Sequence, residues 1–272
     1  MTRNIITFLT LFMVVTAALT GCKKSPVSPD AQITVYLEDA PADYRSITVE
    51  IASVQIFNSS QWIDVPLLQK SISLLNLTGG VSVKLAEGFF PPGDYSMLRI
   101  NFSQEDNRIR LLVGEQEEEF TLGIAIENLT REFPIELSVG DGSQSFLMLD
   151  MDAALSIVMQ AEGVYLLVPK VSLMDLSVSG AISGAIATDA GTAIAERMLV
   201  TTTSTEGVVK HSYTNPSSGN FFVRLPSGTY SLRITPQFES TYQEVFIEQL
   251  VVGEGEPILL GAVKPTLKPR VE

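Results

Sequence analysis

Apolar and polar positions alternate with a period of two along most of the chain from Ala31 onward. Ile33, Val35 and Leu37 are separated by single residues of other types, and the same alternation recurs over 47–51. Successive side chains of a β-strand point to opposite faces of a sheet, so this period predicts strands that each bury one face. We therefore expect an all-β protein.

The sequence also predicts one irregular strand and one short helical turn. The phase of the alternation slips by one residue between Ile51 and Val54, which predicts a β-bulge near Ala52 and Ser53. A helical turn is indicated only over 152–160. Many short strands separated by Gly, Pro, Asn and Asp turns are typical of an antiparallel sandwich. The other strands of this first part are expected at 62–67, 81–85, 95–102, 108–113, 118–122, 133–139, 145–151 and 163–173.

A second set of strands begins near Val178, where glycine-containing turns separate short alternating segments. We expect two tandem antiparallel β-sandwiches of immunoglobulin or transthyretin type, at 31–177 and 178–264, followed by a flexible tail at 265–272. The strands of the second sandwich are expected at 181–187, 193–203, 207–214, 221–225, 229–235, 242–252 and 257–263.

One nine-residue element occurs in both halves of the chain. Residues 92–100 read Pro-Gly-Asp-Tyr-Ser-Met-Leu-Arg-Ile, and residues 226–234 read Pro-Ser-Gly-Thr-Tyr-Ser-Leu-Arg-Ile. Proline favours the turn, and the strand that follows is expected to carry its tyrosine, Tyr95 or Tyr230, inward. We interpret the element as a signature of the fold and not as an active site.

Residues 1–21 have the pattern of a bacterial secretion signal. Arg3 supplies the positive start, and 5–19 form an apolar stretch of about fifteen residues, shorter than the roughly 20 that a membrane-spanning helix needs. This segment is therefore expected to be a signal peptide that is removed from the mature protein.

The last residues of this leader resemble the lipobox of bacterial lipoproteins: Leu19, Thr20, Gly21 and Cys22. Cys22 is also the only cysteine in the chain. The resemblance implies cleavage before Cys22, acylation of its sulfur and amine, and a membrane partner reached through these lipids. Residues 22–30 then form a lipidated tether. The expected location is the cell envelope, at the outer membrane, facing either the periplasm or the cell surface.

Turn-forming motifs follow one another in the second unit, at 183–186, 189–191, 218–221 and 225–230. On these motifs, in this order, residues 181–263 resemble the carboxypeptidase regulatory-like domain, a transthyretin-like sandwich of seven strands. Such domains are usually non-catalytic spacers or binding modules, and the resemblance implies the same role for this unit.

Four short motifs mark the first unit, at 37–44, 74–80, 92–95 and 149–153. On these motifs, residues 32–176 resemble the domain-of-unknown-function 4382 family of secreted and lipid-anchored bacterial proteins. The family name implies no activity, but its members combine a lipid anchor with this domain and a regulatory-like sandwich.

The acidic residues Asp39, Asp43, Asp150 and Asp152 are the candidate metal ligands. Asp39 and Asp43 flank a proline-containing loop, and Asp150 and Asp152 alternate on one strand, so that their carboxylates point the same way. Ca²⁺ takes six to eight oxygen ligands, which such carboxylates supply, although the spacing matches no dedicated calcium loop. The alternative is that Asp39 and Asp43 accept hydrogen bonds from turn amides while Asp150 and Asp152 face solvent.

Most catalytic and nucleic-acid-binding chemistry lacks its characteristic residues in this sequence. A net charge of −13 opposes binding to a phosphate backbone. The one histidine, His211, lies in an alternating segment where it is expected to face solvent. No G-x-S-x-G motif, zinc signature or dinucleotide fingerprint occurs. We therefore expect no enzyme, no cofactor beyond the Ca²⁺ considered above, and no nucleic-acid partner.

Three classes of function remain open. The first is a non-catalytic, lipid-anchored envelope protein that serves as a structural or protein-interaction module, with an envelope protein or glycan as partner. The second is a carbohydrate-binding module, for which exposed aromatic faces are needed. Its candidate aromatics are Trp62, Tyr44, Tyr213 and Tyr242. The third is an enzyme that uses a pair of buried carboxylates.

Overall fold

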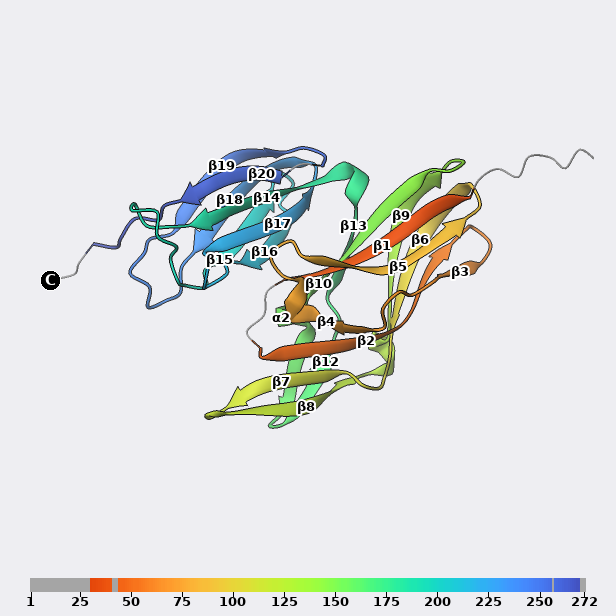
Figure 1. The fold of residues 1–272 in the computed structure, drawn as a ribbon, viewed down its shortest axis with the longest axis horizontal. Coiled ribbons are helices and arrows are strands. Elements are labelled where there is room, and N and C mark those ends of the chain that lie inside the picture. The colour runs from red at the N-terminus through yellow and green to blue at the C-terminus, as the bar shows by residue number, and fades with distance from the viewer. Residues whose placement is uncertain (1–29, 41–43, 256, 270–272) are drawn as a thin grey trace, which may run out of the picture.

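The computed structural model describes residues 30–40, 44–255 and 257–269. Within them the protein is built of β-strands that form two units, each with its own hydrophobic core. The all-β prediction is confirmed. The two units lie side by side, the first at the right of Figure 1 and the second at its left. The expected leader, lipobox and Cys22 lie outside the described residues.

The first unit contains thirteen described strands and three short helical segments. Its strands are β1 (Ala31–Ala40), β2 (Ser46–Phe57), β3 (Trp62–Val65), β4 (Ser71–Ser73), β5 (Ser82–Phe90), β6 (Gly93–Phe102), β7 (Arg108–Val113), β8 (Gln116–Ile124), β9 (Thr130–Val139), β10 (Gln144–Asp152), β11 (Ile157–Ala161), β12 (Val164–Leu167) and β13 (Val171–Asp175). The helical segments are η2 (Leu74–Leu77), η3 (Ile126–Asn128) and α2 (Ala153–Ser156).

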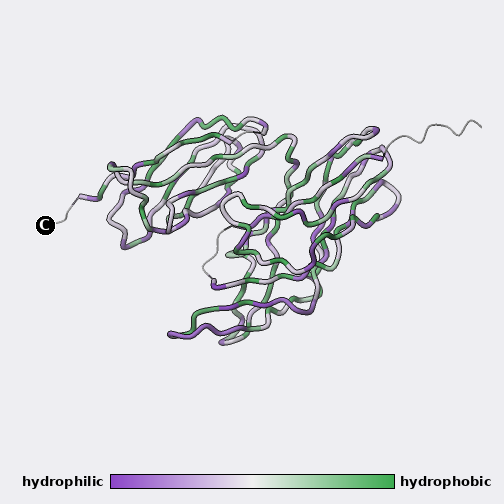
Figure 2. The backbone as a smooth tube through the Cα atoms, in the orientation of Figure 1, coloured by the Kyte–Doolittle hydropathy of each residue, from purple (hydrophilic) through white to green (hydrophobic). Residues whose placement is uncertain are grey.

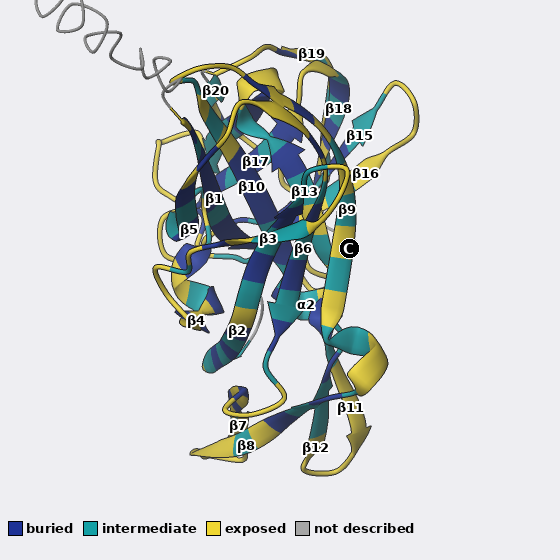
Figure 3. Ribbon diagram, turned by 90° about the vertical axis from the view of Figure 1, so that its right-hand side faces the viewer, coloured by how far each residue is buried: buried dark blue, intermediate teal, exposed yellow. Residues whose placement is uncertain are grey.

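Two sheets enclose the core of the first unit. A four-stranded sheet has the order β13-β10-β1-β5, and the larger sheet has the order β11-β12-β8-β7-β2-β6-β9, with β3 and β4 paired to β2. The alternation in the sequence produces this arrangement, because Val35, Leu149, Ile100 and other apolar positions of each strand point into the shared core. Figure 2 shows apolar and polar residues alternating along these strands. Figure 3 shows β1 and β10 largely buried, whereas the hairpin of β7 and β8 is exposed mainly toward its tip.

The predicted bulge lies in β2. The pairing of β2 with β6 shifts register between Ile51 and Ser53, so that Ile51 and Val54 both reach the core although three positions separate them. The bulge also divides the partners of β2: its first half pairs with β4 and β7, and its second half with β3 and β6. The prediction from the slipped alternation is confirmed.

The expected strand at 163–173 is wrong as a single element. It is divided into β12 and β13, which belong to different sheets. The break falls at Pro169, whose ring fixes φ and which has no amide hydrogen to donate to a ladder. Lys170 there donates its amide to Ser156 Oγ at 2.9 Å instead of to a strand. Residues 164–168 form an uninterrupted apolar run, so the hydrophobic pattern does not mark the break, and the signal in the sequence is Pro169 itself.

The second unit follows η4 (Leu176–Val178) and is a smaller sandwich. A three-stranded sheet, β17-β14-β20, faces a four-stranded sheet, β16-β15-β18-β19, over a core that includes Ile182, Val200, Val223 and Leu232. The strand expected at 193–203 is shorter in the structure, where β15 begins at Leu199. The strands are β14 (Ser179–Ile186), β15 (Leu199–Ser204), β16 (Val209–Tyr213), β17 (Asn220–Pro226), β18 (Gly228–Thr235), β19 (Val245–Val252) and β20 (Pro257–Val263).

Most strand pairs are antiparallel, as expected, but three are parallel: β1 with β10, β8 with β12, and β14 with β20. In the expected flexible tail, residues 266 and 268 form backbone hydrogen bonds with 243 and 241. These bonds tie that part of the tail to the second unit. No helix among the described residues is both long enough and apolar enough to cross a membrane.

The repeated nine-residue element forms the same corner in both units. Tyr95 and Tyr230 are buried, as predicted. The Tyr95 hydroxyl donates to the carbonyl of Pro91 at 2.8 Å, and the Tyr230 hydroxyl donates to the carbonyl of Pro226 at 2.9 Å. Each bond joins the turn to the strand that follows it, which supports the interpretation as a fold signature.

Candidate functional site between the two units

Four charged side chains meet where the two units touch. Glu38 of β1 and Asp150 of β10 come from the first unit, and Lys210 of β16 and Arg224 of β17 come from the second. The Arg224 Nε donates to Glu38 Oε2 at 3.1 Å, and Lys210 Nζ lies 2.6 Å from Asp150 Oδ2. We call these four residues the four-charge cluster.

The register of β1 and β10 places the two carboxylates side by side. Glu38 is directly opposite Asp150 in this parallel pair, and both lie on the sheet face that points away from the core residues Leu37 and Leu149. Two carboxylates at neighbouring positions repel one another, so the site requires cations. The second unit supplies two, one for each carboxylate.

The four-charge cluster is largely buried, and burial disfavours the charged form of its carboxylates. Only 7% of the Glu38 side chain is exposed. Burial raises the pKa of Glu38, and the neighbouring Asp150 raises it further, whereas Arg224 and Lys210 act in the opposite direction and do not fully compensate. Lys210 Nζ also donates to the main-chain carbonyl of Arg224 at 2.9 Å, which joins the two cations of the cluster.

An apolar contact lies beside the charges. The ring of Phe222 rests against the backbone of Gly80, where a Cβ would come within 2.8 Å of the ring. Gly80 has a φ of +88°, a conformation that other residues adopt at a cost, so glycine serves both the turn and the close approach. The guanidinium of Arg224 lies 5.2 Å from the centroid of the same ring.

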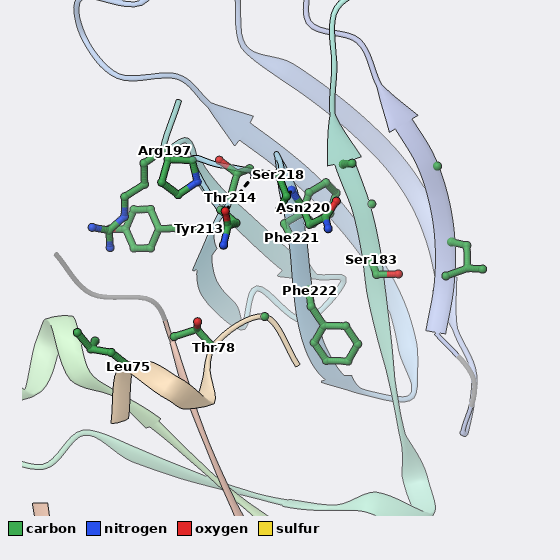
Figure 4. Close-up of a pocket in the computed structure, with 17 residues that line it drawn as sticks. Leu75, Thr78, Ser183, Arg197, Tyr213, Thr214, Ser218, Asn220, Phe221 and Phe222 are labelled. Atoms are coloured by element: carbon green, nitrogen blue, oxygen red, sulfur yellow. Dashed lines mark hydrogen bonds between the residues drawn. The ribbon is translucent and has the colours of Figure 1, made fainter. Parts of the chain in front are cut away.

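A cleft of about 790 Å³ opens next to this contact. Figure 4 shows Leu75 and Thr78 of the first unit across the opening from Tyr213 and Phe222 of the second. Ser183 of β14 also lines it. We call this opening the inter-unit cleft.

One wall of the inter-unit cleft combines an aromatic face with amide groups. The guanidinium of Arg197 lies 4.2 Å from the centroid of the Tyr213 ring. Asn215 and Asn220 line the same wall. Asn215 Oδ1 accepts from the amides of Ser217 and Ser218, which fixes the turn between β16 and β17. Aromatic faces beside amides suit a partner that carries both apolar surface and hydrogen-bonding groups.

Three of the four candidate metal ligands interact with other groups of the protein. Asp39 Oδ1 accepts from the amide of Ala153 at 3.0 Å, and Asp152 Oδ1 accepts from the amide of Leu155 at the start of α2. Asp150 belongs to the four-charge cluster, so the alternative that it faces solvent is wrong.

The fourth candidate ligand, Asp43, lies outside the described residues. Among the residues that are described, no group of three or more His, Cys, Asp or Glu is arranged to hold a metal ion. Because one of the four carboxylates has not been placed, the calcium site stays a prediction.

The four candidate aromatics do not form one site: Tyr44 and Tyr213 border a common pocket, whereas Trp62 and Tyr242 lie elsewhere. Tyr213 lines the inter-unit cleft, and Tyr44 lines a smaller pocket, of about 480 Å³, that Tyr213 also borders. Trp62 packs against Phe57 and lies under the Arg99 guanidinium, 3.8 Å from the ring centroid.

The remaining aromatic candidate, Tyr242, is partly buried against the second core. The histidine, His211, is exposed as predicted, and its Nδ1 lies 3.1 Å from Thr201 Oγ1. These two residues and Trp62 do not line the inter-unit cleft.

Glu38, Lys210 and Arg224 were not among the site residues predicted from the sequence. Alternation does place Glu38 and Asp150 on the outer faces of their strands, and a charged residue on the outer face of a strand normally faces water. The pairing with Lys210 and Arg224 depends on how the two units meet. One signal in the sequence could have pointed to this site: Glu38 and Asp150 are charged outer-face positions that lie within the motifs at 37–44 and 149–153.

These features define a two-unit, all-β protein whose candidate site lies where the units meet. The chain belongs to the family described as "Domain of unknown function (DUF4382)", whose model matches residues 30–169, just over half of the sequence. The resemblance inferred from the short motifs of the first unit is thereby confirmed. No curated protein is similar enough in sequence to count as a relative.

Several solved structures of bacterial proteins show a weak structural likeness. The Bacillus anthracis TIE protein is 12% identical, with a TM-score of 0.27; the match covers 88% of this chain and 34% of that one, so this chain spans about a third of its length. A C-terminal fragment of the pilus adhesin SpaC from Lactobacillus rhamnosus GG is 14% identical, with a TM-score of 0.27 and coverages of 89% and 99%. GBS52, a minor pilin of Streptococcus agalactiae, is 12% identical, with a TM-score of 0.27 and coverages of 88% and 98%. TM-scores this low do not establish a shared overall fold.

Proposed function

We propose that this protein is a non-catalytic, lipid-anchored module of the bacterial envelope that has a structural or protein-interaction role. The observation that carries the proposal is the four-charge cluster. Its ion pairs join β1 and β10 of the first unit to β16 and β17 of the second. A buried, paired contact of this kind favours one relative arrangement of the units, and a fixed arrangement suits a protein that presents a binding surface.

The direction of the chain fits anchoring at one end and display at the other. β1 begins at the end of the first unit that is farther from the second unit and runs toward it (Figure 1). An acylated Cys22 would precede β1 by only a short tether. The second unit, which we propose to be a carboxypeptidase regulatory-like spacer or binding module, would then point away from the outer membrane.

The carboxylates of the site act as structural groups in this proposal. Glu38 and Asp150 are ion-paired, and Asp39 accepts a backbone amide. A general acid or base must contact its substrate, whereas these groups contact protein partners. The inter-unit cleft is where we propose that an envelope partner binds.

The proposal is tested in cells by replacing Cys22 and capturing what the cleft contacts. Cys22→Ser should abolish fatty-acid labelling, and any Cys22→Ser protein that has lost residues 1–21 should move from the membrane to the soluble fraction. A photo-crosslinking residue at Ser218, on the cleft wall, should capture a defined envelope protein, and the same residue at Glu105, in an exposed turn of the first unit, should not. Protease treatment of intact cells reports whether the protein faces the periplasm or the surface. Membrane retention, without fatty acid, of a Cys22→Ser form that has lost residues 1–21 would contradict the anchor.

A second candidate function is carbohydrate binding. The observation that favours it is the position of Tyr213, one of the aromatics expected for this role, beside Asn215 and Asn220 in the inter-unit cleft. Aromatic faces stack on sugar rings while amides bond their hydroxyls. Tyr213→Ala should then weaken retardation of the protein in native gels that contain a soluble polysaccharide. Unchanged retardation would remove the cleft as the sugar site.

A further inference from the structure

A second surface carries exposed aromatic rings that the inter-unit cleft does not include. It is the outer face of the sheet β13-β10-β1-β5, opposite the core side of β1. Phe89 of β5 is 67% exposed and Phe146 of β10 is 38% exposed. Tyr36 of β1 is partly exposed, and its ring lies 6.4 Å from that of Phe146, centroid to centroid. We call Tyr36, Phe89 and Phe146 the aromatic face.

The strand registers show that these three rings share one side of the sheet. Gln32 of β1 is opposite both Phe89 of β5 and Gln144 of β10, so the three side chains form one row across the sheet. Two residues further along β1, Thr34 is opposite Phe146. Partners that are directly opposite point to the same face.

The next row along the same face is formed by Tyr36, which is opposite Lys84 on one side and Met148 on the other. The sites of Phe89 and Phe146 are two strands apart, or about 10 Å across the sheet. That separation allows successive rings of an extended ligand to stack on different aromatics.

Polar groups fill the space between the rings, and their charges cancel. Glu87 Oε1 accepts from Lys84 Nζ at 2.6 Å and from Thr34 Oγ1 at 3.1 Å. Gln144 Nε2 donates to Gln32 Oε1 at 2.7 Å. Each of these amides retains further donor or acceptor capacity, because a glutamine side chain has two donors and two acceptor lone pairs. The face therefore offers aromatic surface, donors and acceptors without net charge.

The second unit borders this surface at one end. Glu38 and Asp150 lie on the same face, one row beyond Tyr36, and it is there that Lys210 and Arg224 of the second unit dock. The aromatic face is thus continuous with the contact between the units.

We infer that the aromatic face binds a neutral, extended oligosaccharide, whose sugar rings stack on Phe89, Phe146 and Tyr36. This inference rests on the second candidate function and names a different site for it. The C–H faces of pyranose rings pack on aromatic side chains, and their hydroxyls bond amides and carboxylates. The local charge balance matches an uncharged chain, and the overall net charge of −13 opposes an acidic one. A protein partner on this face would be the competing outcome.

The experiment is affinity electrophoresis of the full chain in detergent, in native gels that contain hydroxyethyl cellulose, xyloglucan, galactomannan or the acidic polygalacturonate. The wild type should be retarded by at least one neutral polysaccharide and not by polygalacturonate. Phe89→Ala and Phe146→Ala should each weaken that retardation about tenfold. Both residues are exposed, so the variants are expected to fold. Phe238→Ala is the matched control, because Phe238 is 98% exposed and lies in the second unit.

The other outcomes distinguish failure of the aromatic face as the sugar site from failure of carbohydrate binding as a function. Retardation that survives Phe89→Ala and Phe146→Ala but disappears in Tyr213→Ala would overturn the aromatic face and keep carbohydrate binding at the cleft. No retardation by any neutral polysaccharide, or retardation by polygalacturonate alone, would overturn both. Capture of an envelope protein by a photo-crosslinking residue at Phe146 would replace the glycan with a protein partner and overturn the inference.

Discussion

Glu38 and Arg224 lie 186 positions apart in the chain, yet Arg224 Nε donates to Glu38 Oε2 at 3.1 Å. The carboxylate belongs to the first strand of the first unit, and the guanidinium to the middle of the second unit. Removal of either partner leaves the other charge largely buried at the contact between the units.

Arg224→Ala should therefore destabilise the protein by about 3 kcal/mol, because an uncompensated carboxylate remains buried. Urea denaturation measures the loss, and small-angle X-ray scattering should show the two units moving apart. Arg233→Ala is the control, since Arg233 and its partner Glu244 are both about half exposed. That pair should contribute less than about 1 kcal/mol. Equal losses in the two variants would mean that the four-charge cluster does not hold the units together.

The pH dependence of stability should reveal Glu38 directly. Its pKa in the folded protein is raised above the ordinary value of 4.5, so the folded state binds the proton more tightly than the unfolded state. The stability that this provides is fully present below pH 4.5 and is lost as the pH rises through the raised value. The free energy of unfolding of the wild type, relative to Glu38→Gln, should therefore fall as the pH rises above 4.5. Urea titrations of both proteins across this range measure the difference, and a difference that grows with pH would contradict the assignment.

Gly80→Ala should destabilise the contact between the units through a clash with Phe222. The new Cβ would lie 2.8 Å from the ring, and the φ of +88° adds backbone strain. Gly79→Ala is a matched control, because Gly79 has a similar φ of +70° but open space around its Cβ position. Both variants should lose about 1 kcal/mol from strain, and only Gly80→Ala should lose more. Denaturant midpoints compare them, and equal midpoints would show that the ring moves aside without cost.

Tyr95→Phe and Tyr230→Phe should each cost about 1 kcal/mol, because each removes one hydroxyl bond to a carbonyl within the same corner. The two residues belong to different cores, so the losses should be additive in the double variant. Thermal unfolding of the three variants measures this. Wild-type stability in either single variant would show that the corner does not depend on its hydroxyl.

The sequence predicted those features that depend on a single strand and on which of its residues face the core. Alternation predicted the strands, and its slip after Ile51 located the bulge, because both depend on which residues of a single strand reach the core. The break at Pro169 was missed because the apolar run at 164–168 leads directly into the apolar positions Val171 and Leu173, and the proline between them was the only signal of the break. The four-charge cluster and the aromatic face were missed for a related reason. Glu38 and Phe146 are simply outer-face residues until strand order and the packing of the units give them neighbours.

The exposure of Phe89 could have been predicted from the sequence. Phe89 and Phe90 are consecutive, so a strand must point one of the two rings away from the core. Phe90 is buried and Phe89 is exposed. Alternation also places Tyr36, between Val35 and Leu37, on the outer face, but Phe146 begins an apolar run at 146–149 in which alternation does not show which side chains face the core.

The position of β1 determines how the protein would bear a mechanical load. β1 lies inside its sheet, with β10 parallel on one side and β5 antiparallel on the other. A pull on the chain ahead of Ala31 acts along this strand, so the hydrogen bonds on both sides are sheared together instead of being opened one at a time. Tension applied at the N-terminal end would therefore meet the stiffest direction that the sheet offers.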